Sequence, residues 1–221
     1  MKTKIIIISG KKGSGKTTLA KHICDLWKNH VGAKTYKAAD CRIYSFADPL
    51  KHFCINVLGL TPKQCYGSED DKNSMTDLRW INQSQEVLKA YSKRNKKRVI
   101  IYPSGYMTAR EVMEVVGTQI VRKWKPDAWC QAVYNMIETD QPALAVISDA
   151  RNPNEITVGT EMGAKSIRLL YNPYNSTSDS ECALDNFPLG EFSLVVDNSV
   201  LTEKEKNKFV ESKIIKWFKE K

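Results

Sequence analysis

One glycine-rich segment near the start constrains this chain more than any other part of it. The segment reads Gly10-Lys11-Lys12-Gly13-Ser14-Gly15-Lys16-Thr17 and follows a run of isoleucines at residues 5–8. Such a β-branched run is typical of a strand buried on both faces of a parallel sheet. Apolar residues at helical spacing, from Leu19 to Trp27, come next. A buried strand, a G-x-x-x-x-G-K-S/T turn and an amphipathic helix in this order predict a phosphate-binding loop, or P-loop.

The residue types in this loop explain what it would bind. Glycines let the backbone wrap around a polyphosphate with its N–H groups turned inward, and the following helix points its positive end at the same charge. Lys16 is expected to reach the β- and γ-phosphates, and the Thr17 hydroxyl to bind Mg²⁺. We expect ATP with Mg²⁺, because the GTP-reading motif Asn-Lys-x-Asp does not occur. The expected ATP-binding residues are Gly13, Ser14, Gly15, Lys16, Thr17 and Thr18.

The rest of the chain alternates between short apolar runs and amphipathic segments. Further strands are expected at 42–46, 143–147, 166–170 and 194–196. Strands separated by helices predict an α/β fold, a P-loop NTPase sandwich with a mainly parallel sheet. One helix is expected to begin near Pro49 and to continue through Phe53 and Val57, and another to begin near Asn154. Two more are indicated by apolar residues on one face, Val112, Val116 and Ile120 in the first and Trp129, Val133 and Ile137 in the second. A last amphipathic helix is expected at 203–218.

Length and pattern together predict one domain over residues 1–221. Between about 65 and 107 the pattern is poor, with a single strand candidate at Val99–Tyr102. We therefore expect an inserted flap or lid at about 68–105. No stretch approaches the roughly 20 apolar residues that span a bilayer, so no membrane partner is expected.

The cysteines and the net charge limit where the protein is expected to work and what it is expected to bind. Six cysteines occur without a Cys-x-x-Cys pair, so we expect neither a zinc site nor a disulfide framework, and a reduced, cytoplasmic enzyme. The formal net charge of +9 favours anionic partners, either nucleic acid or small phosphorylated ligands. Much of the excess lies in a basic run at 93–98 and in the lysine-rich tail beyond Glu203, both of which are expected to be solvated surface.

Six further segments, taken in order, closely resemble the deoxynucleoside monophosphate kinases of tailed bacteriophages and their relatives. The resemblance covers most of the chain except the part around 68–100. It implies an adenylate-kinase-like fold and transfer of phosphate from ATP to a nucleoside monophosphate, ribo or deoxy. The host cytoplasm is the implied location if the chain is of phage origin. The segments are Phe46–Lys51, Thr108–Met113, Gly117–Arg122 with Trp129, Ser148–Glu155, Met162–Ala164 and Ser180–Asp185.

The same resemblance implies roles for individual positions. Lys12 and Lys51 would approach the monophosphate, and a pocket for the acceptor would be built by Arg110, Gly117, Thr118 and Trp129. Asp149, Arg151 and Glu155 would lie near the acceptor or the transferred phosphoryl group. Relatives often have a histidine before the segment at 180–185, whereas Ser178 and Asp179 stand there in this chain. The base that is accepted therefore stays open.

Elementary chemistry agrees with several of these roles. Phosphoryl transfer needs positive groups around the charge that spreads over the moving phosphoryl. Arg151 follows the Asp149 strand end, the edge of an α/β sheet where ligands bind, so we expect Lys16, Arg151 and Asp149 to be catalytic. Arg110 and Arg122 suit phosphate because the planar guanidinium grips two oxygens at once.

Each of these side chains also has a purely structural interpretation. Arg110 and Arg122 could pair with Glu111 or Asp127 instead. Asp48 is expected to touch substrate or to cap the helix that Pro49 opens. Trp129 has the spacing of a core residue, and Glu155 has the position of a first-turn acid favoured by the helix dipole.

Two other classes of function stay open. A P-loop kinase that acts on a modified base within DNA would explain the +9 charge. A mechanical P-loop module would need a strand ending in Asp-Glu, and Asp149 is followed by Ala150. The favoured acceptor is a small nucleoside monophosphate, and the oligomeric state is open, a homodimer included.

Overall fold

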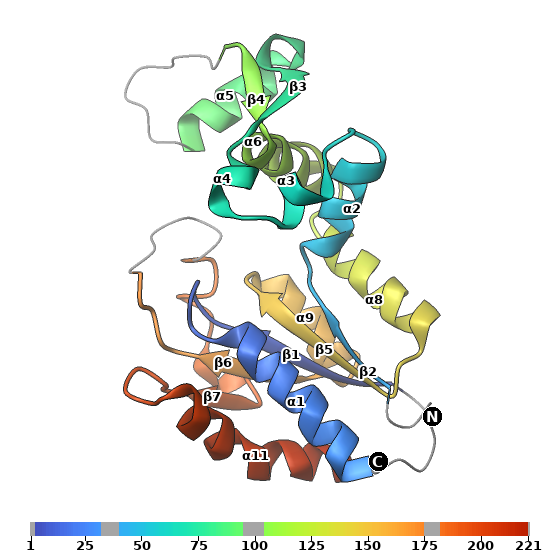
Figure 1. The fold of residues 1–221 in the computed structure, drawn as a ribbon, viewed down its shortest axis with the longest axis vertical. Helices are drawn as coiled ribbons and strands as arrows, with labels where there is room; N and C mark the ends of the chain where they lie inside the picture. The colour runs from blue at the N-terminus through green and yellow to red at the C-terminus, as the bar shows by residue number, and fades with distance from the viewer. Residues whose placement is uncertain (1–2, 32–39, 95–103, 175–181, 221) are drawn as a thin grey trace. The chain divides into compact units, whose positions relative to one another are not determined.

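The computed structural model describes residues 3–31, 40–94, 104–174 and 182–220. The chain divides into two compact units, residues 1–46 with 130–221, and residues 47–129 (Figure 1). The segment expected to be a flap, at 68–105, belongs to the second unit, and its action as a lid stays a prediction. Among the described helices, none combines the length and the apolar character that crossing a membrane would require.

The first unit is built on a sheet of five parallel strands, which confirms the predicted α/β class. The strand order is β2-β5-β1-β6-β7, so the first strand of the chain is central. The strands predicted for this unit from apolar runs are all present, with ends that differ by at most three residues. Their bounds are β1 Lys4–Ser9, β2 Cys41–Tyr44, β5 Leu144–Ala150, β6 Lys165–Leu169 and β7 Leu194–Val196.

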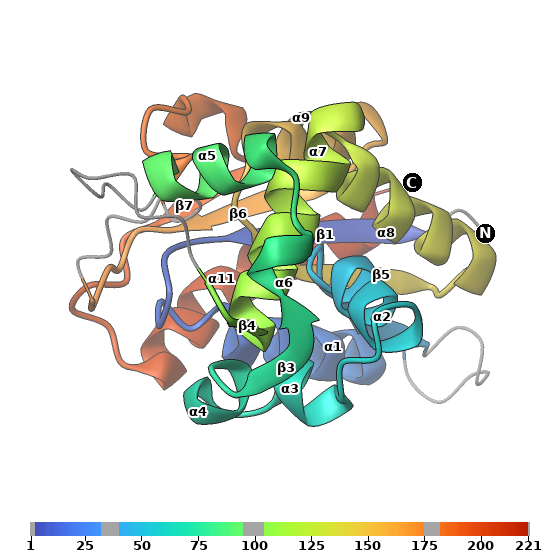
Figure 2. The same ribbon diagram turned by 90° about the horizontal axis from the view of Figure 1, so that it is seen from above.

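Helices cover both faces of this sheet because β1 is apolar on both. Ile6 and Ile8 pack with α1 (Lys16–Val31) and α11 (Glu203–Lys219). Ile5 and Ile7 pack on the other face, with α8 (Ala128–Asp140) and α9 (Pro153–Glu161). In Figure 2 the sheet lies between α1 and α9. The continuous isoleucine run is thus the signature of a strand covered twice.

The register of the sheet brings separate parts of the chain to one edge. Ser9 of β1 lies beside Ala150 of β5 and Arg168 of β6, so the carboxyl ends of these strands meet at one level. Strands β5 and β2 lie on one side of β1, and strands β6 and β7 lie on the other. Ligands of open α/β sheets bind outside such a switch in strand order.

The second unit contains more regular structure than its sequence pattern predicted. Its core includes Cys54, Trp80, Met107 and Val112, all nearly inaccessible to solvent. The strand candidate at Val99–Tyr102 lies outside the described residues. The elements are α2 Asp48–Asn56, α3 Pro62–Tyr66, α4 Glu69–Lys72, β3 Met75–Arg79, η2 Trp80–Asn82, α5 Gln85–Arg94, β4 Tyr106–Thr108, α6 Ala109–Glu114, η3 Val115–Val121 and α7 Arg122–Trp124.

Two expectations about this unit need correction. Residues 65–94 are not poorly structured, because β3 pairs with β4 and short helices begin with capping boxes at Thr61 and Ser68. The helix expected to continue through Val57 contains Phe53 but ends earlier, because α2 stops at Asn56 and Val57 is its C-cap residue. The helix predicted around Val116 is present, but η3 is a π-helical stretch within it, a feature frequent at functional sites.

The expectation that the cysteines form no disulfide is wrong for one pair. Cys24 of α1 and Cys41 of β2 are joined, with their Cα atoms 5.4 Å apart. Spacing in the sequence does not reveal this pair, because the fold alone brings α1 beside β2. Cys54, Cys65 and Cys130 are buried and take no part in this disulfide.

Gly159 provides a test of how α9 lies on β1. A Cβ at this buried position would clash with Ile7 Cδ1 and lie 2.5 Å from the Tyr134 hydroxyl oxygen. Helix propensity favours Gly→Ala by about 1 kcal/mol, but we expect Gly159→Ala to destabilise the protein by about 1–3 kcal/mol through overpacking. Urea denaturation measures the change.

Gly190→Ala is the matched control, because a Cβ there meets open space. It should leave the denaturation midpoint nearly unchanged. A stabilised Gly159→Ala protein would mean that α9 does not pack on β1 this closely.

Candidate functional site: the P-loop and the strand edge

The P-loop joins β1 to α1 at the carboxyl edge of the sheet. Gly13 and Gly15 have φ angles of +77° and +85°, a region that residues with a Cβ rarely adopt. Lys16 is buried, and its Nζ donates to the carbonyl oxygens of Gly10 at 2.7 Å and Lys11 at 2.6 Å. The ammonium is therefore held within the turn of the loop, next to the backbone that would bind phosphate.

The loop also passes a chemical test for a polyphosphate with Mg²⁺. Ser14 Oγ is buried, and among the described residues it has no hydrogen-bond partner. A buried hydroxyl in this state is expected where a bound ligand supplies the missing hydrogen bond. Thr17 is exposed and lies at the start of α1. Within the described part of the chain no cluster of His, Cys, Asp or Glu could hold a metal by itself. Mg²⁺ suits such a site, because it often takes few protein ligands and several phosphate or water oxygens.

A cluster that the sequence did not predict fixes the first half of the loop. Lys11 Nζ lies 2.6 Å from Asp185 Oδ1 and is nearly buried. Arg168 donates to Ser9 Oγ at 2.8 Å and lies 3.7 Å from the same carboxylate. Lys11, with Cys182 and Arg168 beside it, lowers the pKa of Asp185 below its usual range. The only signal in the sequence was that Asp185 ends one of the family-like segments.

Two side chains from the end of the chain hold the second half of the loop. Asn198 donates from Nδ2 to the Ser14 carbonyl oxygen at 3.0 Å and accepts from the Tyr171 N–H. Lys206 of α11 donates to the Gly15 carbonyl oxygen at 3.0 Å. Lys206 belongs to the tail expected to be solvated surface, but it is 3% exposed, so that expectation is wrong at this position.

Asp149 ties the ends of two neighbouring strands together. Its Oδ2 accepts from the Ser45 hydroxyl at 2.5 Å, and its Oδ1 accepts from the Phe46 N–H at 2.7 Å. Asp149 lies near the end of β5, and Ser45 follows β2 directly. The carboxylate is therefore rigidly oriented at the edge of the sheet that carries the P-loop.

Arg151 and Glu155 are linked through the backbone. Glu155 is buried and its Oε2 accepts from the N–H groups of Arg151 at 2.7 Å and Asn152 at 3.0 Å. Its Oε1 accepts from Asn152 Nδ2 at 2.7 Å. The structural interpretation of Glu155 as a first-turn acid is supported, and its effect is to fix where the main chain of Arg151 leaves β5.

In the second unit, Lys51 and Asp48 form a group with Tyr66. Lys51 Nζ lies 4.0 Å from Asp48 Oδ1 and 4.2 Å from the centre of the Tyr66 ring. The Tyr66 hydroxyl donates to Asp48, and burial together with that carboxylate raises the pKa of Tyr66 to about 12. Asp48 does not cap α2, since the N-cap residue is Ala47 and makes no side-chain bond. The capping interpretation is therefore wrong.

Arg110 lies on α6 and has partners other than those weighed from the sequence. Its Nη2 donates to Glu69 Oε2 at 2.7 Å, and its Nε donates to Asn73 Oδ1 at 3.1 Å. Glu111 instead forms the capping box of α6 with Thr108. Arg110 is exposed enough to exchange these partners for a phosphate.

Gly117, Thr118 and Trp129 are positioned by the π-helical stretch. A Cβ on Gly117 would lie 2.7 Å from Leu50 Cδ2, so glycine allows α2 to pack directly on η3. Trp129 is buried, and its Nε1 donates to the Gly117 carbonyl oxygen at 3.1 Å, which supports the core interpretation of this ring. Thr118 is exposed at the start of the next turn, and Arg122 is partly exposed one turn on.

Comparison with known proteins then decides the family. The family model described as "Deoxynucleotide monophosphate kinase" matches residues 60–208. This chain belongs to the deoxynucleotide monophosphate kinase family. The match covers α11 as far as residue 208 as well as most of the second unit, including the part around 68–100 that the resemblance left out.

Two viral proteins are similar to the kinase. The deoxynucleoside-5'-monophosphate kinase of Escherichia phage T5 is 28% identical over 179 residues, 68% of this chain and 69% of the phage protein. A protein of Acanthamoeba polyphaga mimivirus, named "Putative deoxynucleotide monophosphate kinase", is 28% identical over 177 residues, 75% of this chain and 72% of the viral protein.

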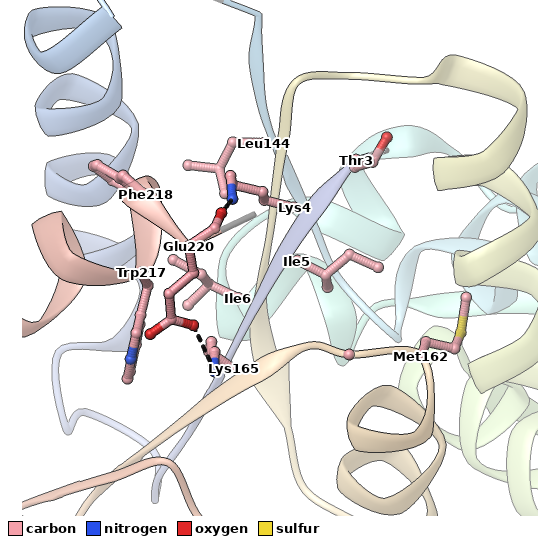
Figure 3. Close-up of a pocket in the computed structure, with 11 residues that line it drawn as sticks. Thr3, Lys4, Ile5, Ile6, Leu144, Met162, Lys165, Trp217, Phe218 and Glu220 are labelled. Atoms are coloured by element: carbon pink, nitrogen blue, oxygen red, sulfur yellow. Dashed lines mark hydrogen bonds and ion pairs between the residues drawn. The ribbon is translucent and has the colours of Figure 1, made fainter. Parts of the chain in front are cut away.

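A cavity elsewhere in the first unit of the kinase is a poor candidate for this chemistry. It has a volume of about 270 Å³ and lies where β1, β5 and β6 begin, lined by Lys4, Leu144 and Lys165 (Figure 3). The P-loop follows the opposite end of β1. Glu220 occupies the rim, pairing with Lys165 at 2.8 Å.

The Lys11–Asp185 pair predicts an acid-sensitive loop. The pKa of Asp185 is lowered from its ordinary value of 3.8, so the carboxylate stabilises the folded kinase at higher pH and ceases to do so as pH falls through the lowered value. We expect Asp185→Asn to lower Tm near neutral pH. The difference from the parent should shrink as pH falls from about 5 to about 2.

Glu161→Gln, which also removes one carboxylate and is exposed on α9, is the control and should follow the parent throughout. A difference between Asp185→Asn and parent that is independent of pH would contradict the ion-pair explanation.

Proposed function

We propose that this kinase transfers the γ-phosphoryl group of ATP, in the presence of Mg²⁺, to the phosphate of a deoxynucleoside monophosphate. An acceptor phosphate oxygen forms the new bond to the γ-phosphorus, the bond to the bridging oxygen breaks, and ADP and a nucleoside diphosphate result. The observation that carries this proposal is an intact P-loop, with Gly13 and Gly15 left-handed and Lys16 within the turn, in a member of this family.

The proposed donor site is the loop Gly13–Thr18. Backbone N–H groups would bind the phosphates, and Lys16 would exchange the carbonyl oxygens of Gly10 and Lys11 for phosphate oxygens. Thr17 would hold Mg²⁺, which would neutralise part of the negative charge of the phosphates. Lys12, exposed on the loop, is proposed to approach the acceptor phosphate.

Arg151 and Asp149 are proposed as the other catalytic residues. A guanidinium near the transferred phosphoryl stabilises the charge that develops on its oxygens. Glu155 supports this role by fixing the Arg151 main chain. Asp149, fixed by Ser45 and Phe46, is proposed to orient a water on Mg²⁺ or the acceptor sugar.

The proposed acceptor residues are cationic or hydrogen-bonding side chains of the second unit. Lys51 would bind the monophosphate from its place beside Asp48 and Tyr66. Binding of an anion by Arg110 would cost its contact with Glu69, an exposed pair worth little in water. The residues of the second unit proposed to bind the acceptor are Asp48, Lys51, Arg110, Gly117, Thr118, Arg122 and Trp129. From the first unit, Lys12, Asp149, Arg151 and Glu155 are proposed as well.

The setting of the reaction belongs to the same proposal. Free nucleotides in the cytoplasm, the host cytoplasm for a phage protein, would be the substrate pool. The segment 68–105 is proposed to act as a lid over the acceptor.

The test of this function is an acceptor screen. The protein is incubated with ATP, Mg²⁺ and each common deoxynucleoside and ribonucleoside monophosphate in turn, and the diphosphates formed are separated and counted. At least one deoxynucleoside monophosphate should be converted. Duplex DNA is the parallel acceptor, and phosphate transferred to DNA but to no monophosphate would refute the proposed acceptor.

Lys16→Ala tests the donor site. Loss of the lysine should lower kcat by about a hundredfold or more, because charge stabilisation in the transition state is lost. Lys21→Ala, an exposed lysine further along α1, should keep the parental kcat. Unchanged turnover of a folded Lys16→Ala protein would show that the loop does not bind the reacting phosphates.

Lys51→Ala tests the acceptor site. Since its proposed partner is the acceptor phosphate, we expect the Kd of the monophosphate to rise about tenfold or more, a loss typical of a charged hydrogen bond, with the Kd of ATP within about twofold. Arg110→Ala should behave in the same way. Lys125→Ala, exposed in the same unit and outside segment 68–105, is the control, and equal losses for ATP and monophosphate would mean that Lys51 is misassigned.

A further inference from the structure

A buried lysine from the closing helix contacts the P-loop helix at its first turn. Lys206 Nζ donates to the Gly15 carbonyl oxygen at 3.0 Å and to Thr18 Oγ1 at 3.2 Å. The Thr18 hydroxyl donates in turn to the Gly15 carbonyl oxygen at 2.9 Å. One ammonium thus holds both the main chain and a side chain of the proposed ATP site.

Gly15 makes this contact sterically possible. A Cβ on Gly15 would lie 2.5 Å from Lys206 Nζ. The glycine therefore serves two purposes, since its φ of +85° shapes the loop and its missing side chain admits the lysine. A capping box between Thr202 and Glu205 begins α11 just before Lys206 and fixes where this lysine leaves the helix.

Burying the charged ammonium of Lys206 costs free energy when no anion lies nearby. Its residue is 3% exposed, and among the described residues its hydrogen bonds go to neutral oxygens. Burial lowers the pKa of Lys206, and Glu203 on the same helix opposes this in part. Replacing such a buried charge by an apolar side chain is often neutral or stabilising, so fold stability alone does not explain the lysine.

We propose that Lys206 is a positioning residue for the donor nucleotide, which holds Gly15 and Thr18 in place and adds a buried positive charge behind the phosphate loop. Lys206 acts through these two residues and not by touching phosphate. A polyphosphate in the loop gains from this charge because a low-dielectric surrounding screens it little. The inference rests on the proposed ATP donor.

The test combines nucleotide affinity with stability. Lys206→Met keeps the chain length and removes the charge, and Lys206→Gln restores a donor without charge. For Lys206→Met the Kd of ATP and of ADP should rise about tenfold or more, as for other charged contacts, with the Kd of the monophosphate within about twofold. Its Tm without nucleotide should match or exceed the parent's. The ATP affinity of Lys206→Gln should lie between that of the parent and that of Lys206→Met.

A matched control and a double-mutant cycle separate the alternatives. Lys208→Met, exposed on the same helix, should resemble the parent in every measurement. Combining Lys206→Met with Thr18→Val should cost less ATP affinity than the sum of the two single changes, because one interaction is removed twice.

Four outcomes would overturn the inference. A parental ATP affinity with a lowered Tm in Lys206→Met would make the lysine a packing residue only. Strictly additive losses with Thr18→Val would show that Lys206 does not act through Thr18. If the parent itself bound no ATP, the proposed donor would fall and this inference with it, whereas ATP binding by parent and Lys206→Met alike would refute the inference alone.

Discussion

The turn between β1 and α1 is the constraint on which the rest of the first unit depends. Its backbone must adopt left-handed conformations at Gly13 and Gly15, and its N–H groups must stay available to a ligand. Other parts of the unit therefore hold the turn from outside. Asp185 binds Lys11, and Asn198 and Lys206 bind carbonyl groups of the loop. A buried strand covered on both faces gives this turn a rigid base.

Side chains also fix the main chain along the edge of the sheet next to the loop. Asp149 uses both carboxylate oxygens on the end of the neighbouring strand, and Glu155 uses both of its own around Arg151 and Asn152. These hydrogen bonds fix the two carboxylates, whereas the Arg151 side chain follows directly after β5 at the same edge of the sheet. In the second unit, Arg110 is held by the exposed Glu69, which an anionic ligand can replace at little cost, and Lys51 lies beside the partly buried Asp48.

The sequence predicted the first unit well and the second unit poorly, for a physical reason. A parallel sheet needs continuous apolar strands and amphipathic helices, whose patterns are strong in Ile5–Ile8 and Leu144–Ile147. The second unit uses short helices and one antiparallel pair of short strands, β3 with β4, whose patterns are too short to recognise. Contacts between distant segments, such as Cys24 with Cys41 or Lys206 with Gly15, leave no trace in local spacing. Lys206 even lies in a lysine-rich tail whose composition indicates solvated surface.

We propose that this chain moves the γ-phosphoryl group of ATP directly to a small phosphate acceptor. The most direct measurement uses ATP labelled at its γ-phosphate, with the protein in excess over ATP and a single deoxynucleoside monophosphate present. Label should appear in the deoxynucleoside diphosphate at the rate at which ADP forms. Label that appears only as inorganic phosphate, or on added DNA, would contradict the account.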